Sequence, residues 1–367
     1  MSTSSLQSRL RRLKRNDDPT AGLERLEEEL LGGAKDDEGA SLKDRLQALV
    51  EVASRRERPG RGAPVPLEEL VDGWRRENER GEFFVLDTSV HLEERHGDVP
   101  LSRCHTISPD TVSVLSAEPE LAGFDLREAV YLDTETTGLA GGAGTAAFLI
   151  GAGWFEGERF RVRQYFMRDY HEEGALLQAL EEDIAGFSSI VTYNGRAFDI
   201  PLLDTRFRLA RSRFSLGEVP HLDLLHPARR LWKERLESCR LQSLEVALLG
   251  LRRHGDIPGD EIPQVYFDWV RRRDARLMAK VFEHNRQDIV SLAAVAVLAC
   301  QWVEEASAED PRDVYSLARV FERARLYERS EAEYQRALDL GAGALKGPAL
   351  LRLGWRAKRS RDYERAA

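Results

Sequence analysis

Apolar and polar positions divide the chain into a charged N-terminal stretch, a central part with strand and helix patterns, and a helical tail. Runs that predict strands are residues 83–86, 129–132, 146–155, 159–167 and 189–193. Residues 129–132 are continuously apolar, which is typical of a strand buried on both faces. Residues 156–158, Glu-Gly-Glu, predict a hairpin turn between two of these strands.

Helical spacing appears between and after the strands. Leu176, Leu177, Leu180 and Ile184 share one face of a helix predicted for residues 173–184. Further helices are predicted for residues 200–209, 241–249, 275–282 and 288–303. A strand hairpin followed by alternating helices and strands predicts an α/β domain with a mixed sheet and flanking helices.

The two ends of the chain differ from this domain. Residues 1–65 carry charges in blocks and predict a disordered or partly helical arm, and residues 66–125 predict a lead-in segment that packs on the α/β domain of residues 126–305. Residues 310–367 predict an all-helical tail. Its apolar pattern recurs after 36 positions, from Leu317 to Leu353, close to the spacing of about 34 in tetratricopeptide repeats. The second repeat is incomplete.

Composition narrows the class of protein. The 367 residues are 42% hydrophobic and 32% charged, which excludes a wholly disordered chain, and the net charge of −9 excludes a basic coat over the whole chain. Three scattered cysteines predict reduced thiols and a cytoplasmic location. The longest apolar run, residues 292–300, is about half a membrane span, so no membrane insertion is expected.

A pair of carboxylates follows the buried strand of residues 129–132. Asp133 and Glu135 are two positions apart, so on a strand they point to the same face. Two buried carboxylates repel each other and lose hydration, and divalent cations offset both costs. Oxygen ligands favour hard ions such as Mg²⁺ or Mn²⁺. Taken alone, the pair is equally compatible with an acidic turn at the end of a strand.

Two further acidic motifs follow along the chain. Asp199 lies at a predicted strand-to-helix junction, and His284 and Asp288 lie four positions apart on one face of a predicted helix. Four carboxylates can hold two metal ions that clamp the attacking and leaving oxygens of a phosphodiester. Histidine, with an ordinary pKa of about 6.5, is suited to take the proton from water.

The three motifs, in this order, resemble those of the DEDD 3′–5′ exonucleases, which have the ribonuclease-H-like fold. The matching segments are residues 133–139, 194–199 and 284–288. The chain in particular resembles the bacterial YprB-like ribonuclease-H-like family, through residues 256–266 and 284–292 and through a tetratricopeptide-like tail. The resemblance covers about residues 126–302.

The resemblance implies roles for individual residues. Asp133, Glu135, Asp199 and Asp288 would hold two Mg²⁺ or Mn²⁺ ions, and His284 would activate water. Substrate contacts are expected from the remaining positions of the first two motifs, namely Thr136, Gly138, Leu139, Asn194 and Phe198. The four-residue spacing from His284 to Asp288 departs from the histidine subtype of these exonucleases, which uses five.

Basic side chains concentrate in residues 201–280, which hold 16 basic and 11 acidic groups. Because phosphate neutralisation is the main source of affinity for nucleic acid, this segment predicts substrate binding. We assign Arg271, Arg272 and Arg273 to that role. Phe214, Trp232 and Trp269 are candidates for stacking on bases. Solvated helix faces are the alternative for each single run of arginines.

The sequence therefore predicts a metal-dependent nuclease that removes nucleotides from the 3′ ends of single-stranded nucleic acid. A structure-selective endonuclease on the same fold is one alternative. Another is a binding scaffold with an idle site. In the scaffold, the tetratricopeptide-like tail recruits a protein partner.

Overall fold

The computed structural model describes residues 63–138 and 144–359. The chain divides into two units, Met1–Ala63 and Pro64–Ala367, and the description concerns the second. The charged arm predicted for residues 1–65 therefore lies almost entirely outside the described residues. Leu139, a predicted substrate contact, lies outside them as well.

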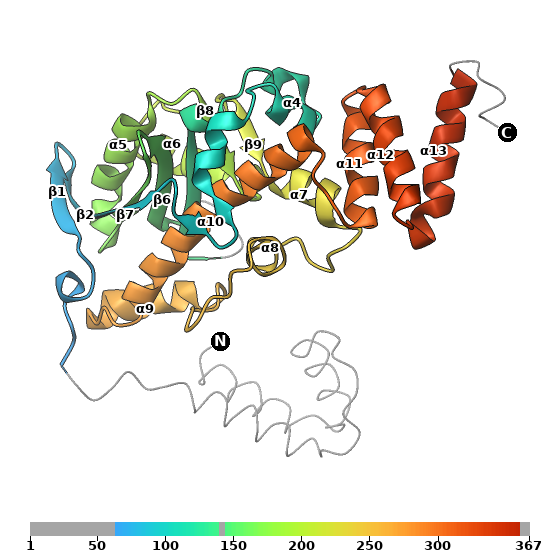
Figure 1. Ribbon diagram of the computed structural model, residues 1–367. Coiled ribbons are helices and arrows are strands. Elements are labelled where there is room, and N and C mark those ends of the chain that lie inside the picture. Colours follow the sequence, from blue (N-terminus) through green and yellow to red (C-terminus); the bar gives the residue numbers. More distant parts are fainter. Residues whose placement is uncertain (1–62, 139–143, 360–367) are drawn as a thin grey trace, which may run out of the picture. The chain divides into compact units, whose positions relative to one another are not determined.

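Seven strands form one mixed sheet (Figure 1). In spatial order they are β1 (Trp74–Asn78), β2 (Gly81–His91), β7 (Arg159–Phe166), β6 (Ala147–Glu156), β5 (Ala129–Thr136), β8 (Ser189–Thr192) and β9 (His221–Asp223). β5, β8 and β9 run parallel, and the other neighbours are antiparallel. A separate two-stranded sheet pairs β3 (Arg95–His96) with β4 (Val99–Pro100).

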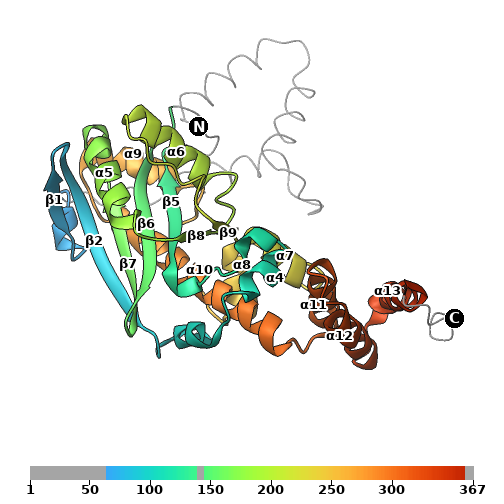
Figure 2. The same cartoon turned by 90° about the horizontal axis from the view of Figure 1, so that it is seen from above.

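Helices cover both faces of the large sheet (Figure 2). They are α4 (Thr111–Ser116), α5 (Glu173–Ile184), α6 (Asp199–Leu209), α7 (Leu225–Trp232), α8 (Leu241–Leu248), α9 (Ile262–Arg272) and α10 (Met278–Glu305). Short 3-10 turns occur at Leu67–Glu69, Leu101–Thr106, Pro119–Leu121, Leu126–Glu128, Tyr170–Glu172 and Gly343–Leu345. The mixed sheet with flanking helices confirms the predicted α/β architecture.

β5 is buried on both faces, as its apolar run predicts. Ala129 and Tyr131 belong to a core that includes side chains of α4, α7, α8 and most of α10. Val130 and Leu132 belong to a second core, with side chains of α5, α6, α9 and the first turns of α10. Because successive side chains of a strand point to opposite faces of the sheet, the apolar side chains of β5 are shared between two cores.

The segment expected to lead into the domain supplies part of its sheet. β1 and β2 form a hairpin, and β2 pairs with β7 from Phe84 opposite Phe166 to His91 opposite Arg159. Phe83, Phe84 and Val85 are fully buried in the second core. Residues 66–125 therefore contribute two strands to the sheet as well as packing against it.

α10 is a central core helix of 28 residues. Its length and its mean hydropathy of 1.3 would suffice for a membrane span, but 67% of its most apolar window is buried inside the protein. It also carries His284, Asn285 and Asp288. Burial against the sheet accounts for its apolar composition.

Two glycines on β6 let α10 lie close to the sheet. A Cβ atom on Gly151 would stand 2.4 Å from Asn285 Oδ1, and one on Gly153 would stand 2.5 Å from Ile289 Cγ2. Gly151 pairs with Asp133 of β5. The space left by a missing side chain therefore lies directly beside the first acidic motif.

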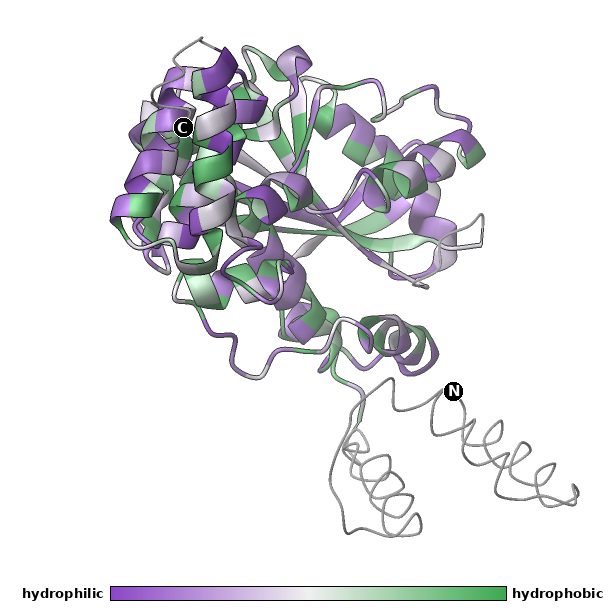
Figure 3. Ribbon diagram, turned by 90° about the vertical axis from the view of Figure 1, so that its right-hand side faces the viewer, coloured by the Kyte–Doolittle hydropathy of each residue, from purple (hydrophilic) through white to green (hydrophobic). Residues whose placement is uncertain are grey.

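The tail is helical throughout its described part. α11 (Pro311–Arg323) packs on α12 (Tyr327–Asp339) through Tyr315 and Tyr334, whose ring centroids are 5.5 Å apart, and α13 (Lys346–Arg359) follows. Figure 3 shows polar residues on many outward positions of these helices. Arg235, just after α7, bonds to Asp313 at 2.5 Å, which connects the tail to the α/β domain. Its assignment to the tetratricopeptide repeats stays a prediction.

We predict that Gly151→Ala lowers the free energy of unfolding by about 1–3 kcal/mol, because the new methyl group must displace α10 from the sheet. Gly186→Ala is the matched control, since a Cβ there meets nothing within 4 Å, and it should change stability by less than about 1 kcal/mol. Urea unfolding measures both. If the two substitutions changed stability equally, the packing of α10 on the sheet would not depend on the missing side chain at Gly151.

Candidate metal centre

Polar side chains collect where the parallel strands end. β5, β8 and β9 are neighbours in the sheet and run in the same direction, so their carboxyl ends share one edge. Asp133 and Glu135 lie at the end of β5. Asn194 follows β8, and Asp223 ends β9. The sheet topology thus brings together residues that are far apart in the sequence.

The first acidic motif is tied to α10 by an amide. Asn285 Nδ2 donates to Asp133 Oδ2 at 2.8 Å, and Gln164 Nε2 donates to Asn285 Oδ1 at 2.9 Å. Asn285 is fully buried, so its orientation is fixed by these two bonds. The bond to Asp133 sets the position of α10, and therefore of His284 and Asp288, relative to β5.

Asp199 is the first residue of α6 and is almost fully buried. Thr134, which lies between Asp133 and Glu135 on the opposite face of β5, donates from Oγ1 to Asp199 Oδ1 at 2.5 Å. Asp199 therefore reaches the same strand end from the other layer of helices. The structure brings the second acidic motif to the first, as the sequence predicts.

Asp223 shapes the turn that leads to Asp199. Its carboxylate accepts the backbone N–H groups of Asn194 at 2.7 Å and of Arg196 at 3.1 Å. Asn194 has φ of 67°, a left-handed conformation that asparagine tolerates better than most residues. This turn directs the chain from β8 into α6 and so places Asp199 at the strand end.

His284 faces two of the carboxylates. Its Nε2 lies 3.4 Å from Asp288 Oδ2 and 4.0 Å from Glu135 Oε1. One ligand atom from each of these three residues lies within 4.8 Å of the others, close enough to hold one metal ion together. The His284 side chain is only 6% exposed, so its ring has little freedom to turn away.

Asp256 orients this imidazole. Its Oδ1 lies 2.9 Å from His284 Nδ1, and a carboxylate at that distance favours a proton on Nδ1, which leaves Nε2 free to accept one. Arg253 Nη1 lies 3.3 Å from the other oxygen of Asp256. The pair therefore fixes both the ring plane and the tautomer of His284.

Arg253 offsets part of the negative charge. Its guanidinium contacts Asp288 and also bonds to Glu245, whose side chain is 1% exposed. Ser291 Oγ, one turn beyond Asp288 on α10, donates to Glu245 at 2.5 Å. A buried arginine held among three carboxylates stabilises the negative cluster, and among the described residues no ion pair joins a lysine or arginine to Asp133, Glu135 or Asp199.

Burial and mutual repulsion disfavour the charged state of these acids. Burial, together with the charges of Asp288 and Asp199, raises the pKa of Asp133 well above its usual value. Burial and the same neighbours raise the pKa of Glu135. Burial raises the pKa of Asp199 to about 6. Burial also raises the pKa of Asp288, although Arg253 opposes it. Such a cluster of hard oxygen ligands fits divalent cations.

The predicted substrate contacts lie around this edge. Thr136 Oγ1 donates to the carbonyl of Gly138 at 2.9 Å, which closes the turn after β5. Asn194 lines a surface cavity. Phe198 is 57% exposed although the next residue, Asp199, is buried. An exposed aromatic ring beside a metal ligand is well placed to pack on a nucleotide base.

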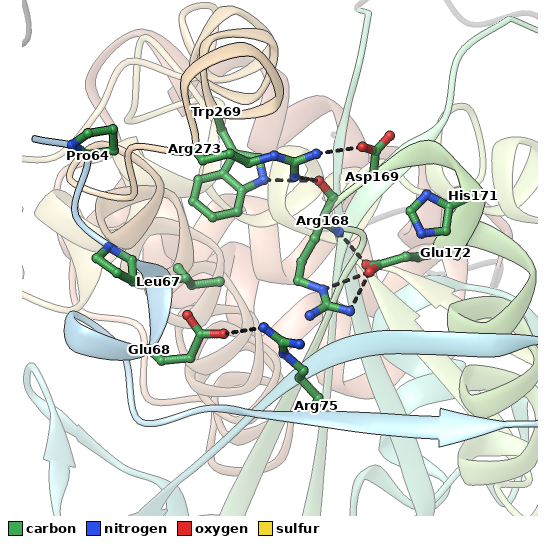
Figure 4. Close-up of a pocket in the computed structure, with 11 residues that line it drawn as sticks. Pro64, Leu67, Glu68, Arg75, Arg168, Asp169, His171, Glu172, Trp269 and Arg273 are labelled. Atoms are coloured by element: carbon green, nitrogen blue, oxygen red, sulfur yellow. Dashed lines mark hydrogen bonds and ion pairs between the residues drawn. The ribbon is translucent and has the colours of Figure 1, made fainter.

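Arg271, Arg272 and Arg273 lie at the C-terminal end of α9 and are exposed. Arg273 bonds to Asp169 at 2.6 Å and to the carbonyl of Arg168 at 2.6 Å (Figure 4). It is therefore engaged within the protein. None of the contacts found among the described residues joins these three arginines to the carboxylate cluster.

The prediction that Trp232 and Trp269 stack on bases is wrong, and for the half-buried Phe214 it stays a prediction. Trp232 is fully buried against Trp302, with ring centroids 5.6 Å apart, and Trp269 is 6% exposed. Phe214 packs on Phe207 of the second core. Trp232 and Trp269 fill the interior because α7 and α9 turn an apolar face inward, whereas Phe214 is half-buried in the loop after α6.

The residues that sequence reasoning missed are Arg253, Asp256 and Asn285. Asn285 directly follows His284, so its place in the third motif was a usable signal. Arg253 and Asp256 lie in the loop between α8 and α9, 31 and 28 positions from His284. No spacing rule predicts a contact between a loop and a helix so far along the chain.

Known proteins resemble this chain over the same region. Residues 130–300 match the family model of the RNase_H superfamily. The chain is 34% identical over 242 residues to the uncharacterized protein YprB of Bacillus subtilis (strain 168), which covers 65% of this chain, and it spans 58% of the length of that relative. A family B DNA polymerase from the hyperthermophilic archaeon Pyrobaculum calidifontis matches with a TM-score of 0.36 and 17% identity, over 53% of this chain and 29% of the polymerase. The family match contains all four acidic residues and His284, and together with YprB it supports the RNase H-like family.

Proposed function

We propose that this protein is a nuclease that hydrolyses phosphodiester bonds with two divalent metal ions, as a 3′–5′ exonuclease on single-stranded nucleic acid in the cytoplasm. The match to the RNase_H superfamily suggests a nuclease-type function. The observation that carries the proposal is the convergence at a single sheet edge of one imidazole and four acidic side chains, of which Asp199 is buried and the other three are partly buried.

The acidic residues divide into two groups that suit two ions. Glu135, His284 and Asp288 bring their ligand atoms within 4.8 Å of one another. Asp133 lies on β5 and accepts from Asn285 of α10, and Asp199 at the start of α6 accepts from Thr134 of β5. When bound, Mg²⁺ or Mn²⁺ ions neutralise these acids, polarise the phosphate and help to deprotonate water.

His284 is assigned as the general base. With Asp256 accepting from Nδ1, the neutral ring carries its lone pair on Nε2, which faces Glu135 and Asp288. Water at this position can donate its proton to Nε2, and the resulting imidazolium is stabilised by Asp256. In a second role compatible with the same geometry, Nε2 is itself a metal ligand. The two roles differ in whether metal binding survives loss of the ring.

Phe198 and the turn after β5 are assigned to positioning the substrate. The exposed ring of Phe198 lies next to Asp199 in the chain and presents an apolar surface beside the metal ligands. The turn of Thr136 and Gly138 follows Glu135 directly. Together they hold the terminal nucleotide against the sheet edge, so that its phosphodiester faces the acidic residues.

We predict that Mn²⁺ raises the melting temperature of the wild-type protein, because bound ions remove the repulsion among the buried acids. A ligand at 100 times its Kd stabilises by about 2.7 kcal/mol. Asp133→Asn should abolish this increment while leaving the metal-free protein at least as stable, since it removes one repelling charge and keeps an acceptor for Asn285. Asp260→Asn, at an exposed position, is the control. A full Mn²⁺ increment in Asp133→Asn would contradict the ligand assignment.

Cleavage of 5′-labelled single-stranded DNA and RNA with Mn²⁺ tests the reaction. We expect a ladder that shortens from the 3′ end, and no cleavage of a circular strand. Asp199→Asn should remove the activity, because the carboxylates act as a unit, whereas Asp260→Asn should retain it. Cleavage of the circle would show an endonuclease instead. Mn²⁺ binding without any cleavage would show a scaffold.

We predict that His284→Ala lowers the turnover rate by about 10²–10⁴-fold, the usual cost of losing a general base, and leaves Mn²⁺ stabilisation largely intact. Asp256→Ala should lower turnover by about 10–100-fold, because the ring loses its orientation. Asp256→Asn keeps an acceptor for Nδ1 and should retain most of the activity. Loss of Mn²⁺ stabilisation in His284→Ala would identify the imidazole as a ligand rather than a base.

A further inference from the structure

Two adjoining cavities form a basic groove between the metal centre's edge of the sheet and the helical tail. The first, of about 630 Å³, extends from Tyr193 and Asn194 to Arg240 and Leu241. The second, of about 350 Å³, lies between α7 and α11. Both are lined by Arg229 and Lys233, so they are two parts of one surface feature, called here the basic groove.

Positive charge dominates this groove. Its basic lining residues are Arg229, Arg230, Lys233, Arg240, Arg319 and Arg323, and its acidic ones are Glu234 and Glu237. Arg319 lies 3.4 Å from Glu234. Arg229, Lys233 and Arg323 have no ion pair with any carboxylate among the described residues. Burial and the charge of Arg323 lower the pKa of Arg230, which shows that these cations repel one another.

Several arginines elsewhere in the described part of the chain bond to acids. Arg163 bonds to Asp87 and Asp183, Arg206 to Glu173, and Arg273 to Asp169. The basic groove departs from this arrangement, because it gathers cations from two helices without matching carboxylates. Like charges held together in this way are stabilised by an anionic ligand.

The cations are arranged along two helices that face the same cavity. Arg229 and Lys233 are four positions apart along α7 and the residue that follows it, and Arg319 and Arg323 are four positions apart on α11. Residues with this spacing share one helix face. Each wall of the groove thus presents a pair of cations toward an extended anion.

One end of the groove lies at Asn194, at the same edge of the sheet as the candidate metal centre. Asn194 follows β8, the strand next to β5, and α7 begins directly after β9, the next strand of the sheet. A nucleic-acid strand whose end lies at the end of β5 would therefore pass Asn194, then Arg229 and Lys233 on the α7 side of the groove, and then the helical tail.

We propose that the basic groove binds the phosphate backbone of a single-stranded nucleic acid whose 3′ end lies at the metal centre, with α11 of the tail as one wall. This inference rests on the proposed function and gives the tail a role in substrate binding. An acidic protein segment would meet the same charges. The groove begins at Asn194, a residue of the second motif of the candidate site, which favours the strand that is being cut.

Binding measurements without divalent ions test the groove, because no strand is then cleaved. The variant combines Arg229→Ala, Lys233→Ala and Arg323→Ala. Its matched control combines Arg103→Ala, Arg161→Ala and Lys346→Ala, which remove the same charges from exposed positions outside both cavities and outside residues 201–280. Fluorescence anisotropy measures the affinity for strands of about 4 and about 20 nucleotides, which bracket the usual site sizes.

We expect the groove variant to lose affinity for the longer strand by on the order of 10²-fold near 0.1 M salt. The slope of log K against log salt should fall by about 2, since each lost contact to a single strand contributes about 0.7. The shorter strand should lose less, and the control should stay close to wild type. If melting shows the triple variant misfolded, single Arg229→Gln and Arg323→Gln changes should each lower the slope by about 0.7.

If the groove variant and the control bound the longer strand with equal affinity, the proposal that the groove binds the strand would be overturned. Competition by polyglutamate as strong as that by single-stranded DNA of equal charge would overturn it in favour of an acidic protein ligand. Failure of the proposed function has a different signature. A wild-type protein that binds the longer strand through the groove but cuts nothing with Mn²⁺ would refute the nuclease and leave the groove standing.

Discussion

The close approach of α10 to β5 and β6 is the constraint on which the candidate site depends. Gly151 leaves the space, and Asn285 uses it to bond Asp133 and to accept from Gln164. The same helix then presents His284 and Asp288 to Glu135. A shift of α10 by the width of one methyl group would therefore break packing and chemistry together, because the core and the site share a single helix face.

The arrangement stores an electrostatic cost that the fold offsets only in part. Arg253 compensates Asp288 and Glu245, and Thr134 donates to Asp199, but within the described part of the chain Glu135 has no ion pair except with His284. Stability alone would favour apolar side chains at these positions. Retention of so many buried acids makes sense where cations bind, since an ion of double charge repays the repulsion and the lost hydration together.

Predictions from the sequence were confirmed where an apolar run with a strand pattern leads directly into acidic residues. The apolar run before Asp133 predicted a strand buried on both faces, and the structure divides it between two cores. Sequence reasoning failed for Trp232, because an aromatic residue in a basic segment looks the same in a core as on a binding surface. Asp256 escaped notice for another reason. Its contact with His284 depends on how the loop before α9 folds back over α10, and such long-range contacts leave no local pattern.

The function of the basic residues near the tail depends on where the fold places them. Along the sequence, Arg229 and Lys233 belong to one basic segment and Arg323 to a distant one, and a solvated helix face was a sufficient account of each segment alone. In space α7 and α11 bring them to one groove that begins beside Asn194. A helical extension that served only to recruit proteins would have no need to complete a basic wall against the α/β domain. Because it does so, and because Arg235 bonds Asp313 across the same junction, the tail acts in the proposed mechanism as part of the substrate-binding surface.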